Sequence, residues 1–157
     1  MTRPPPYRIV DADWSRDQSG IQAVRRVVFV EEQGIPENLE WDGVDGDCRH
    51  VLALARDEDI IATGRLMTDG RIGRMAVLRA WRGRGVGREL LARLQQQALK
   101  DGLQQVYVHA QLEVAGFYRS AGFVDIGVPF VVADIAHVEM KKMLDVACTA
   151  AAEFSRG

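Results

Sequence analysis

A segment rich in glycine and arginine has the composition of a phosphate-binding loop. Residues 82–88 read Arg-Gly-Arg-Gly-Val-Gly-Arg and follow the apolar run Met75-Ala76-Val77. If the run ends a strand and the segment opens a helix, free backbone N–H groups, the positive end of a helix dipole and guanidinium groups would surround one anion. Glycine at positions 83, 85 and 87 would let that anion approach the backbone closely. The segment therefore predicts a site for a ligand rich in phosphate, such as a pyrophosphate.

Two common nucleotide-binding motifs do not fit this segment. The dinucleotide fingerprint G-x-G-x-x-G is not met, because Leu90 stands where its third glycine is required after Gly85 and Gly87. The Gly-Lys-Ser/Thr sequence of a Walker loop is also absent. The segment thus favours neither a nicotinamide dinucleotide nor a P-loop nucleotide.

A second motif lies about thirty residues further along the chain, where residues 117–123 read Phe-Tyr-Arg-Ser-Ala-Gly-Phe. Together the two segments resemble the GNAT superfamily of acyl-CoA N-acyltransferases. Arg82, Gly85 and Gly87 match the family's Q/R-x-x-G-x-G/A signature, and the second motif matches its Phe-Tyr-x3-Gly-Phe segment, which contacts CoA.

Three further stretches narrow the resemblance. Residues 28–33, 41–42 and 137–140 look like the ElaA/YjcF-like subgroup of this superfamily. The resemblance covers roughly residues 7–144.

The resemblance implies acetyl-CoA as the cosubstrate and no metal. Met75, Ala76 and Val77 would line the pantetheine arm with their main-chain groups. Phe117 and Gln111 would also contact CoA, and Gln111 stands where many family members carry asparagine. The pyrophosphate would lie in the loop formed by Arg82, Gly83, Arg84, Gly85, Val86, Gly87 and Arg88.

The resemblance also implies direct attack of an amine on the thioester, without a covalent acyl-enzyme. The backbone N–H near Val77 would stabilise the tetrahedral oxyanion, an effect worth roughly 3 kcal/mol per donor in other enzymes. Tyr118 would protonate the departing thiolate. A thiol of pKa about 8.5 needs little acid help to leave, and a positioned phenol of pKa about 10 can give it. The alternative for Tyr118 is a core aromatic whose hydroxyl is satisfied.

The amine acceptor must lose a proton before it attacks, because a lysine-like amine with a pKa of about 10.4 is mostly charged at neutral pH. A general base or a water relay is therefore needed. The candidates are Glu31, Glu32, His109, His137 and Glu139. We expect Glu32 or His109 to act as the base, and Glu31, Glu32 and His137 to contact the acceptor. A structural role is the alternative for each histidine.

Charge is distributed unevenly along this part of the chain. Residues 31–48 contain seven acids and no base, whereas residues 71–101 contain eight arginines or lysines and two acids. One end of the site is thus expected to favour phosphate and the other a cation. The alternative for the acidic run is a solvated surface.

The leading hypothesis is an N-acetyltransferase that acts on a primary amine of a small molecule or peptide. A non-catalytic acyl-CoA-binding regulatory module is the alternative. Nucleic-acid binding through the arginines is a third reading, which the net charge of −2 disfavours. We expect no nucleic-acid partner and leave a homodimer open.

The cysteines and the hydropathy indicate the compartment. Cys48 and Cys148 show neither metal-ligand spacing nor a secretory context, and neither looks catalytic. No run of about 18 apolar residues occurs in the sequence. We therefore expect a cytoplasmic protein without a membrane partner.

The apolar pattern places these motifs on strands and helices of one domain, which suits 157 residues with 47% hydrophobic content. We expect a disordered leader at 1–6, a single domain at 7–144 and a tail at 145–157. The first helix should open with a capping box at Ser15-Arg16-Asp17-Gln18. The expected strands are 7–11, 50–55, 60–67, 71–78, 104–110, 123–128 and 136–144, and the expected helices are 15–32, about 84–101 and 113–121, with a loop or a single helical turn at 37–47.

The resemblance implies that these elements form the GNAT fold, of the α/β (α+β) class. Its mixed central sheet would have six to seven strands and about four flanking helices. The sheet would splay between the strand before the glycine-rich loop and the next strand.

Overall fold

The computed structural model describes residues 6–144. The predicted tail at 145–157, with Cys148, lies outside the described residues, and so does the predicted leader apart from Pro6. In chain order the elements are β1 (Tyr7–Asp11), α1 (Trp14–Arg25), the π-helix η1 (Arg26–Glu32), α2 (Glu37–Glu40), η2 (Asp45–Asp47), β2 (Arg49–Ala55), β3 (Ile60–Leu66), β4 (Ile72–Val77), η3 (Arg79–Trp81), α3 (Val86–Lys100), β5 (Gln105–Gln111), η4 (Leu112–Val114), α4 (Ala115–Ser120), β6 (Val124–Val132) and β7 (Ile135–Met143).

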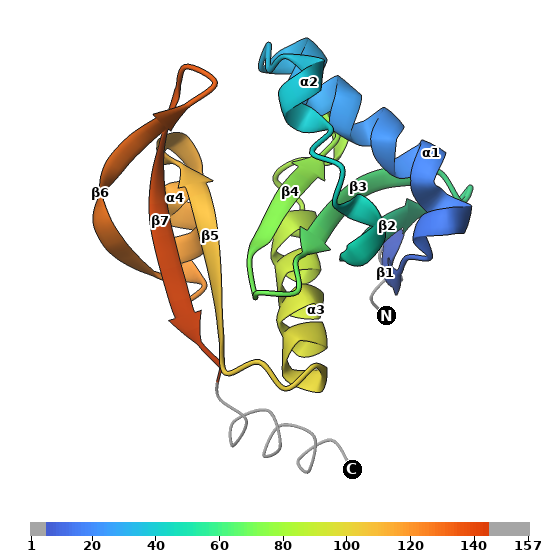
Figure 1. Ribbon diagram of the computed structural model, residues 1–157. Helices are drawn as coiled ribbons and strands as arrows, with labels where there is room; N and C mark the ends of the chain where they lie inside the picture. Colours follow the sequence, from blue (N-terminus) through green and yellow to red (C-terminus); the bar gives the residue numbers. More distant parts are fainter. Residues whose placement is uncertain (1–5, 145–157) are drawn as a thin grey trace.

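The strands form two antiparallel sheets that meet at one end. The first sheet has the order β1-β2-β3-β4, and the second has the order β5-β7-β6. β4 and β5 run parallel and touch where Arg71 bridges Tyr107 and the Tyr107 N–H donates to the Gly70 carbonyl at 3.1 Å. From there the two strands diverge (Figure 1). The predicted fold and its splay are therefore confirmed, with the sheet divided by hydrogen bonding into two parts.

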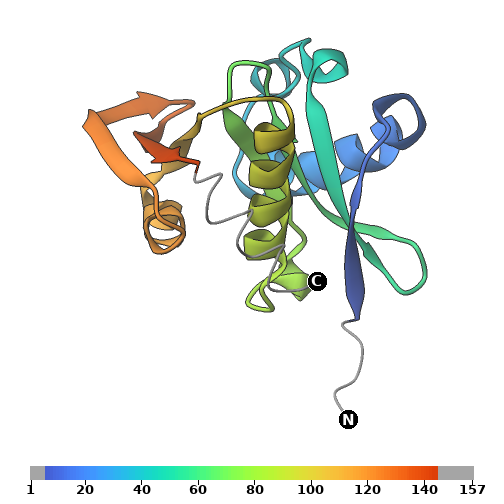
Figure 2. The ribbon, with the colours of Figure 1, turned by 90° about the horizontal axis from the view of Figure 1, so that it is seen from below.

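Helices cover both faces of the first sheet. α1 packs against β3 and β4 on one face, and α3 packs against β2 and β3 on the other. Figure 2 shows α1 and α3 separated by these strands. The loop from β4 to α3, which contains the glycine-rich segment, lies at the end of the molecule where β4 and β5 are furthest apart (Figure 1).

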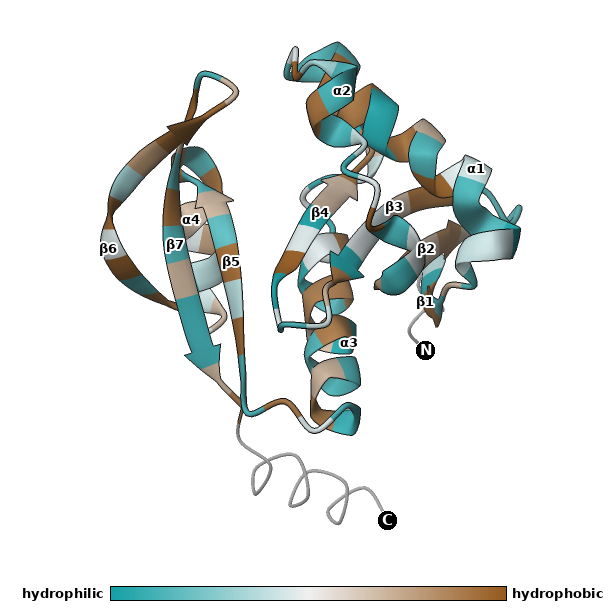
Figure 3. Ribbon diagram, in the orientation of Figure 1, coloured by the Kyte–Doolittle hydropathy of each residue, from teal (hydrophilic) through white to brown (hydrophobic). Residues whose placement is uncertain are grey.

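The core lies between α3 and the strands. The predicted helical stripe of α3 is fully buried: Val86, Leu90, Leu91, Leu94 and Ala98 are at most 1% exposed. Figure 3 shows apolar and polar residues alternating around α3. Because one face of α3 is anchored along its length, its N-terminal end is held at a fixed position beside β4.

The first helix begins one residue earlier than predicted, and its N-cap is Asp13 instead of Ser15. Asp13 caps α1 by accepting hydrogen bonds from the N–H groups of Ser15 and Arg16 at 3.0 and 3.4 Å. The side chain of Asp17 accepts from the Asp13 N–H at 2.9 Å, so the capping side chains are those of Asp13 and Asp17 and not those of Ser15 and Gln18. An aspartate caps a helix as well as a serine does, and the pattern alone did not separate the two registers.

β6 continues through Pro129, where the sequence predicts a loop. Its pairing with β7 is interrupted between Ile126 and Phe130, and Gly127 in this interval has a φ of 71°. A proline is tolerated there because β6 is an edge strand, and because the interrupted ladder requires no backbone N–H donor at this position.

Candidate active site

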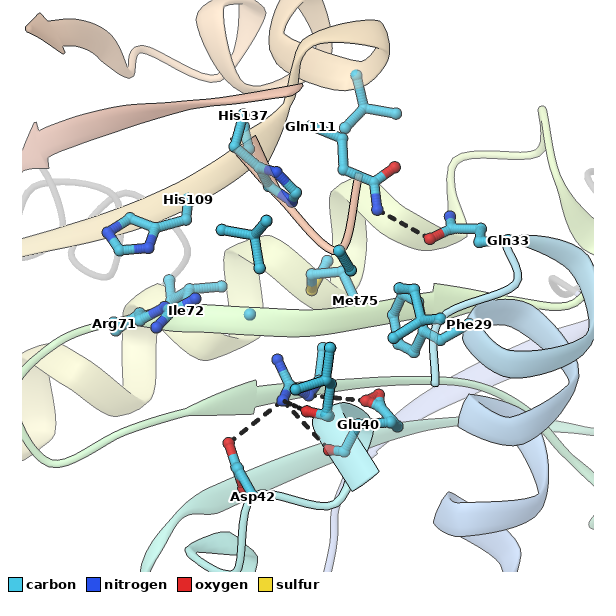
Figure 4. A pocket seen from close by; sticks show the side chains of 18 of the residues that line it. Phe29, Gln33, Glu40, Asp42, Arg71, Ile72, Met75, His109, Gln111 and His137 are labelled. Carbon is cyan, nitrogen blue, oxygen red and sulfur yellow. Dashed lines mark hydrogen bonds and ion pairs between the residues drawn. The ribbon is translucent and has the colours of Figure 1, made fainter. Parts of the chain in front are cut away.

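A cavity of about 330 Å³ lies in the splay between the two sheets. β4 forms one wall, β5 and β7 form the other, and η1 and α2 contribute at one end (Figure 4). The lining residues are Phe29, Gln33, Ile35, Leu39, Glu40, Asp42, Arg71, Ile72, Gly73, Arg74, Met75, His109, Ala110, Gln111, Val114, Tyr118, Val132, Ala133 and His137.

A β-bulge in β4 shapes this wall. Thr63 pairs with Ala76 and Arg65 pairs with Gly73, so Arg74 and Met75 together oppose Gly64 alone. Arg74 takes the left-handed conformation with a φ of 49°. The extra residue alters the alternation of side chains, and Met75 lines the cavity.

Val77 presents its main chain to the splay. The Leu78 N–H donates to the Ile61 carbonyl at 3.0 Å, so residue 78 faces β3. Because these directions alternate along an antiparallel ladder, the N–H and C=O of Val77 point away from β3, toward the side of β5. The N–H that the resemblance assigns to the oxyanion therefore faces the splay.

The glycine-rich loop leaves a run of backbone N–H groups without acceptors. Gly83 and Gly85 have φ values of 76° and 84°, and Gly85 is the N-cap of α3. Within residues 6–144, the N–H groups of 83–85 donate to no acceptor, and helical geometry leaves those of 86–88 unpaired. A Cβ at Gly87 would lie 3.6 Å from the Phe117 ring, so this glycine is next to the aromatic residue of the second motif. The loop has the donors of an anion site.

The arginines of the loop differ in their surroundings. Arg82 donates to the Val77 carbonyl at 2.8 Å and pairs with Glu32 at 2.7 Å. The Arg84 guanidinium lies 5.2 Å from the centre of the Trp81 ring, and Arg88 is exposed. Arg82 is thus fixed at the end of β4, whereas Arg84 and Arg88 lie at the surface.

The two glutamates predicted on the acceptor side do not line the cavity. Glu31 is exposed, and Glu32 is held by Arg82. The neighbouring Gln33 lines the cavity, and its Oε1 accepts from Gln111 Nε2 at 2.8 Å across the splay (Figure 4). The wider turns of the π-helix η1 change which side chains face inward, and the apolar pattern of an ordinary helix could not reveal this.

Tyr118 lies on α4 and lines the cavity. Only 7% of the residue is exposed, and its ring packs edge-on against Phe117 and Phe123. Its hydroxyl makes no hydrogen bond within the described chain, which disfavours the alternative of a satisfied core hydroxyl. Burial raises the pKa of Tyr118 to about 12, so the phenol stays protonated at neutral pH.

Two histidines come together on the wall opposite β4. His109 Nε2 lies 3.3 Å from Glu139 Oε1, and His137 Nδ1 lies 2.7 Å from the Ile135 carbonyl. The Phe130 ring contacts both imidazole rings, with ring centres 5.2 and 5.8 Å away. Burial and then the charge of Arg71 lower the pKa of His109, and Glu139 opposes the shift. His109 is therefore a neutral imidazole at neutral pH.

The sequence suggested that the acidic run would offer free carboxylates to a cation, but the carboxylates of the run at and behind the cavity are paired with arginines. Arg74 Nε lies 2.8 Å from Glu40, Arg65 Nη2 lies 2.9 Å from Asp42, and Arg25 Nη1 lies 2.7 Å from Asp45. Burial raises the pKa of Asp42, but hydrogen bonding to Arg65 more than offsets this and holds that pKa at about 2. The expectation was wrong because the arginine partners lie on α1, β3 and β4, far away in sequence.

Within 6–144 no group of three or more His, Cys, Asp or Glu side chains is arranged to hold a metal ion. None of the described helices is long and apolar enough to cross a membrane.

Comparison with known proteins agrees with this arrangement. Residues 21–144 match the family model described as Acetyltransferase (GNAT) domain. The protein ElaA of Escherichia coli is 31% identical over 127 residues, 76% of this chain and 82% of ElaA. The uncharacterized N-acetyltransferase YjcF of Bacillus subtilis is 30% identical over 129 residues, which are 76% of this chain and 87% of YjcF.

A solved structure gives the same result in three dimensions. The crystal structure of an acyl-CoA N-acyltransferase from Pseudomonas aeruginosa superimposes with a TM-score of 0.77 at 31% identity, over 87% of this chain and 99% of that one. The family match, the relatives and the fold agree with one another, and the chain belongs to the GNAT acetyltransferases.

Proposed function

We propose that this protein transfers an acetyl group from acetyl-CoA to a primary amine of a small molecule or peptide. The amine nitrogen attacks the thioester carbonyl directly, a C–N bond forms, and the C–S bond breaks. One proton leaves the amine for a base, and one proton goes to the CoA thiolate. The observation that carries the proposal is the cavity, which has a buried, protonated Tyr118 on one wall and the bulged strand β4 on the other.

The loop at 82–88 suits the pyrophosphate of acetyl-CoA. Its unpaired N–H groups and the start of α3 supply donors and a positive dipole, and the exposed Arg84 and Arg88 add positive charge. Arg82 is already paired with Glu32, so we assign it to fixing the end of β4, with its charge still close to the phosphates.

Two groups would act on the reacting atoms from opposite walls. The Val77 N–H faces the splay and would bind the oxyanion as it forms, an interaction worth roughly 3 kcal/mol in other enzymes. Tyr118 would donate its phenolic proton to the thiolate. Its raised pKa keeps that proton in place over the whole neutral range, and the hydroxyl has no competing partner within residues 6–144.

His109 suits the role of general base. Its lowered pKa keeps it neutral, and it lines the cavity. Glu139 accepts from Nε2 and would leave Nδ1 free to take the proton from the amine. His137 would contact the acceptor. Glu32, the other predicted base, is engaged by Arg82, which favours His109.

The test is Tyr118→Phe, assayed by thiol release with a panel of amines, amino acids and peptides. General acids contribute about 10²–10⁴-fold, and because a thiolate needs little help we expect a loss of kcat near the lower end. Acetyl-CoA affinity, measured by calorimetry, should change little. An unchanged kcat would remove Tyr118 as the acid. Tight acetyl-CoA binding by the unmodified protein without any acceptor-dependent thiol release would instead favour a non-catalytic CoA-binding module.

A further inference from the structure

The charged side chains that line the cavity differ in whether they have an ion-pair partner. Four charged residues line it, namely Glu40, Asp42, Arg71 and Arg74. Three of them are paired, because Arg74 lies 2.8 Å from Glu40 and 3.3 Å from Asp42. Asp42 is held in addition by the buried Arg65.

The carboxylates are therefore unavailable to a cationic ligand. Glu40 is 2% exposed, and Arg25 Nε lies 3.5 Å from its other oxygen. Burial raises the pKa of Glu40 although Arg74 and Arg25 lower it, and in either protonation state it offers no unpaired negative charge. A polyamine or another multiply charged cation would find no counter-ion on these walls.

Arg71 is the exception among the four. Its backbone is anchored, since its N–H donates to Asp69 at 3.0 Å and its carbonyl accepts from the Met67 N–H at 2.8 Å. Its guanidinium makes no hydrogen bond or ion pair with any residue from 6 to 144. The nearby acids have other partners: Asp69 accepts from the Tyr107 hydroxyl, and Glu139 contacts His109.

Arg71 lies close to the predicted base. Its positive charge is the second cause, after burial, of the lowered pKa of His109. Figure 4 shows Arg71 and His109 near each other at one end of the cavity, with Phe29 and Gln33 toward the other end. A ligand held by Arg71 would therefore pass the imidazole on its way to the thioester.

We propose that Arg71 binds a carboxylate on the acceptor, so that the substrate class is amines that also carry a carboxylate at some distance. This rests on the proposed function. The planar guanidinium matches a carboxylate in a two-bond fork. Arg71 immediately precedes β4, and because Arg74 and Met75 together oppose one residue of β3, the path from Arg71 to Val77 advances by about five extended residues, roughly 17 Å at about 3.3 Å per residue. An α-amino acid is too short for this span, whereas a short peptide or a long ω-amino acid is suitable.

The experiment compares a tripeptide bearing a free C-terminal carboxylate with the same peptide amidated at that end. For the unmodified protein we expect kcat/KM for the free acid to exceed that for the amide by about 10- to 100-fold, the usual worth of a charge-assisted hydrogen bond. Arg71→Gln should bring this ratio close to one, and Arg71→Lys should leave an intermediate ratio. Arg79→Gln, which removes an exposed arginine outside the cavity, should keep the ratio of the unmodified protein.

Calorimetric titration of the CoA-loaded protein with both peptides separates this inference from the proposed function. Preferential binding of the free acid that Arg71→Gln abolishes would support the inference even if no thiol were released, and the proposed function alone would then fail. Thiol release with equal use of both peptides would overturn the inference and leave the function standing. Equal binding, or no binding, of the two peptides would also overturn it.

Discussion

Gly64→Ala tests whether the bulge of β4 holds Met75 in place. A Cβ at Gly64 would lie 2.7 Å from Met75 Sδ and 2.9 Å from Leu94 Cδ1, both well inside contact distance. Leu94 is fully buried in the core, whereas Met75 lines the cavity. The added methyl group should therefore push Met75 into the cavity beside β4, the strand along which the resemblance places the pantetheine arm.

The magnitude follows from two opposing terms. Overpacking a core typically costs about 1–3 kcal/mol. Glycine-to-alanine changes at compatible positions return about 0.4–1 kcal/mol by restricting the unfolded chain. We expect a net loss of about 1–2 kcal/mol of the free energy of unfolding, which lowers the Tm of a domain of this size by about 2–8 °C.

Thermal denaturation and acetyl-CoA calorimetry should be measured together. If Met75 moves into the cavity, the Tm falls less than it would if Met75 stayed in place. Bound acetyl-CoA must then force the Met75 side chain back against the methyl group introduced at position 64. A strain of about 1 kcal/mol would then weaken acetyl-CoA binding about fivefold. Gly73→Ala is the stability control, because no heavy atom lies within 4 Å of the Cβ that it adds. An unchanged Tm together with unchanged acetyl-CoA affinity in Gly64→Ala would refute the reasoning.

Three further outcomes are expected. Gly85→Ala should lose about 1–2 kcal/mol of the free energy of unfolding, because the φ of 84° at Gly85 is left-handed, and it should bind acetyl-CoA less tightly. Gly116→Ala is the control in the same denaturation and binding assays. It should show neither loss, because open space surrounds the added Cβ. Glu139→Gln should shift the acid limb of the kcat/KM profile to lower pH, since Glu139 raises the pKa of His109, and an unmoved limb would argue against His109 as the base. Burial lowers the pKa of His50 below its ordinary value of 6.5, so the unfolded chain takes up a proton at a higher pH than the folded chain does. The free energy of unfolding should therefore fall as the pH drops below about 6.5. Urea denaturation at several pH values should show a less steep fall in His50→Phe.

Local motifs were the part of the site that could be predicted from the sequence. The glycine-rich segment and the Phe117-Tyr118 motif carry their geometry within a few residues, because positive φ values and a helix start depend on neighbouring residues. The apolar stripe of α3 could also be predicted, since a 3.6-residue period of apolar residues identifies the buried face of a helix. These features, together with the resemblance, led to the correct fold.

Partners far apart in sequence could not be predicted in this way. Periodicity tells which face of an element is buried, but not which residue on another strand it meets, so the contacts of Arg74 with Glu40 and of Gln33 with Gln111 were missed. The bulge at Arg74 and the π-turns of η1 also change side-chain phase without a clear mark in the sequence. The acceptor side depends on such contacts, and for this reason its assignments changed most.

The buried charge cluster has an evolutionary consequence. It joins three arginines, Arg25, Arg65 and Arg74, to three carboxylates on α2 and the segment after it. Removing one member of a buried ion pair typically costs about 3–5 kcal/mol, a large part of the 5–15 kcal/mol that stabilises a typical domain. A substitution at one of these six positions should therefore persist only together with a compensating substitution at a partner, and homologues should keep or lose the charged residues of the cluster jointly. Since Arg74 is itself the bulged residue, the shape of the β4 wall of the cavity inherits this constraint from a charge cluster that extends to the buried Arg25 and Arg65 behind it.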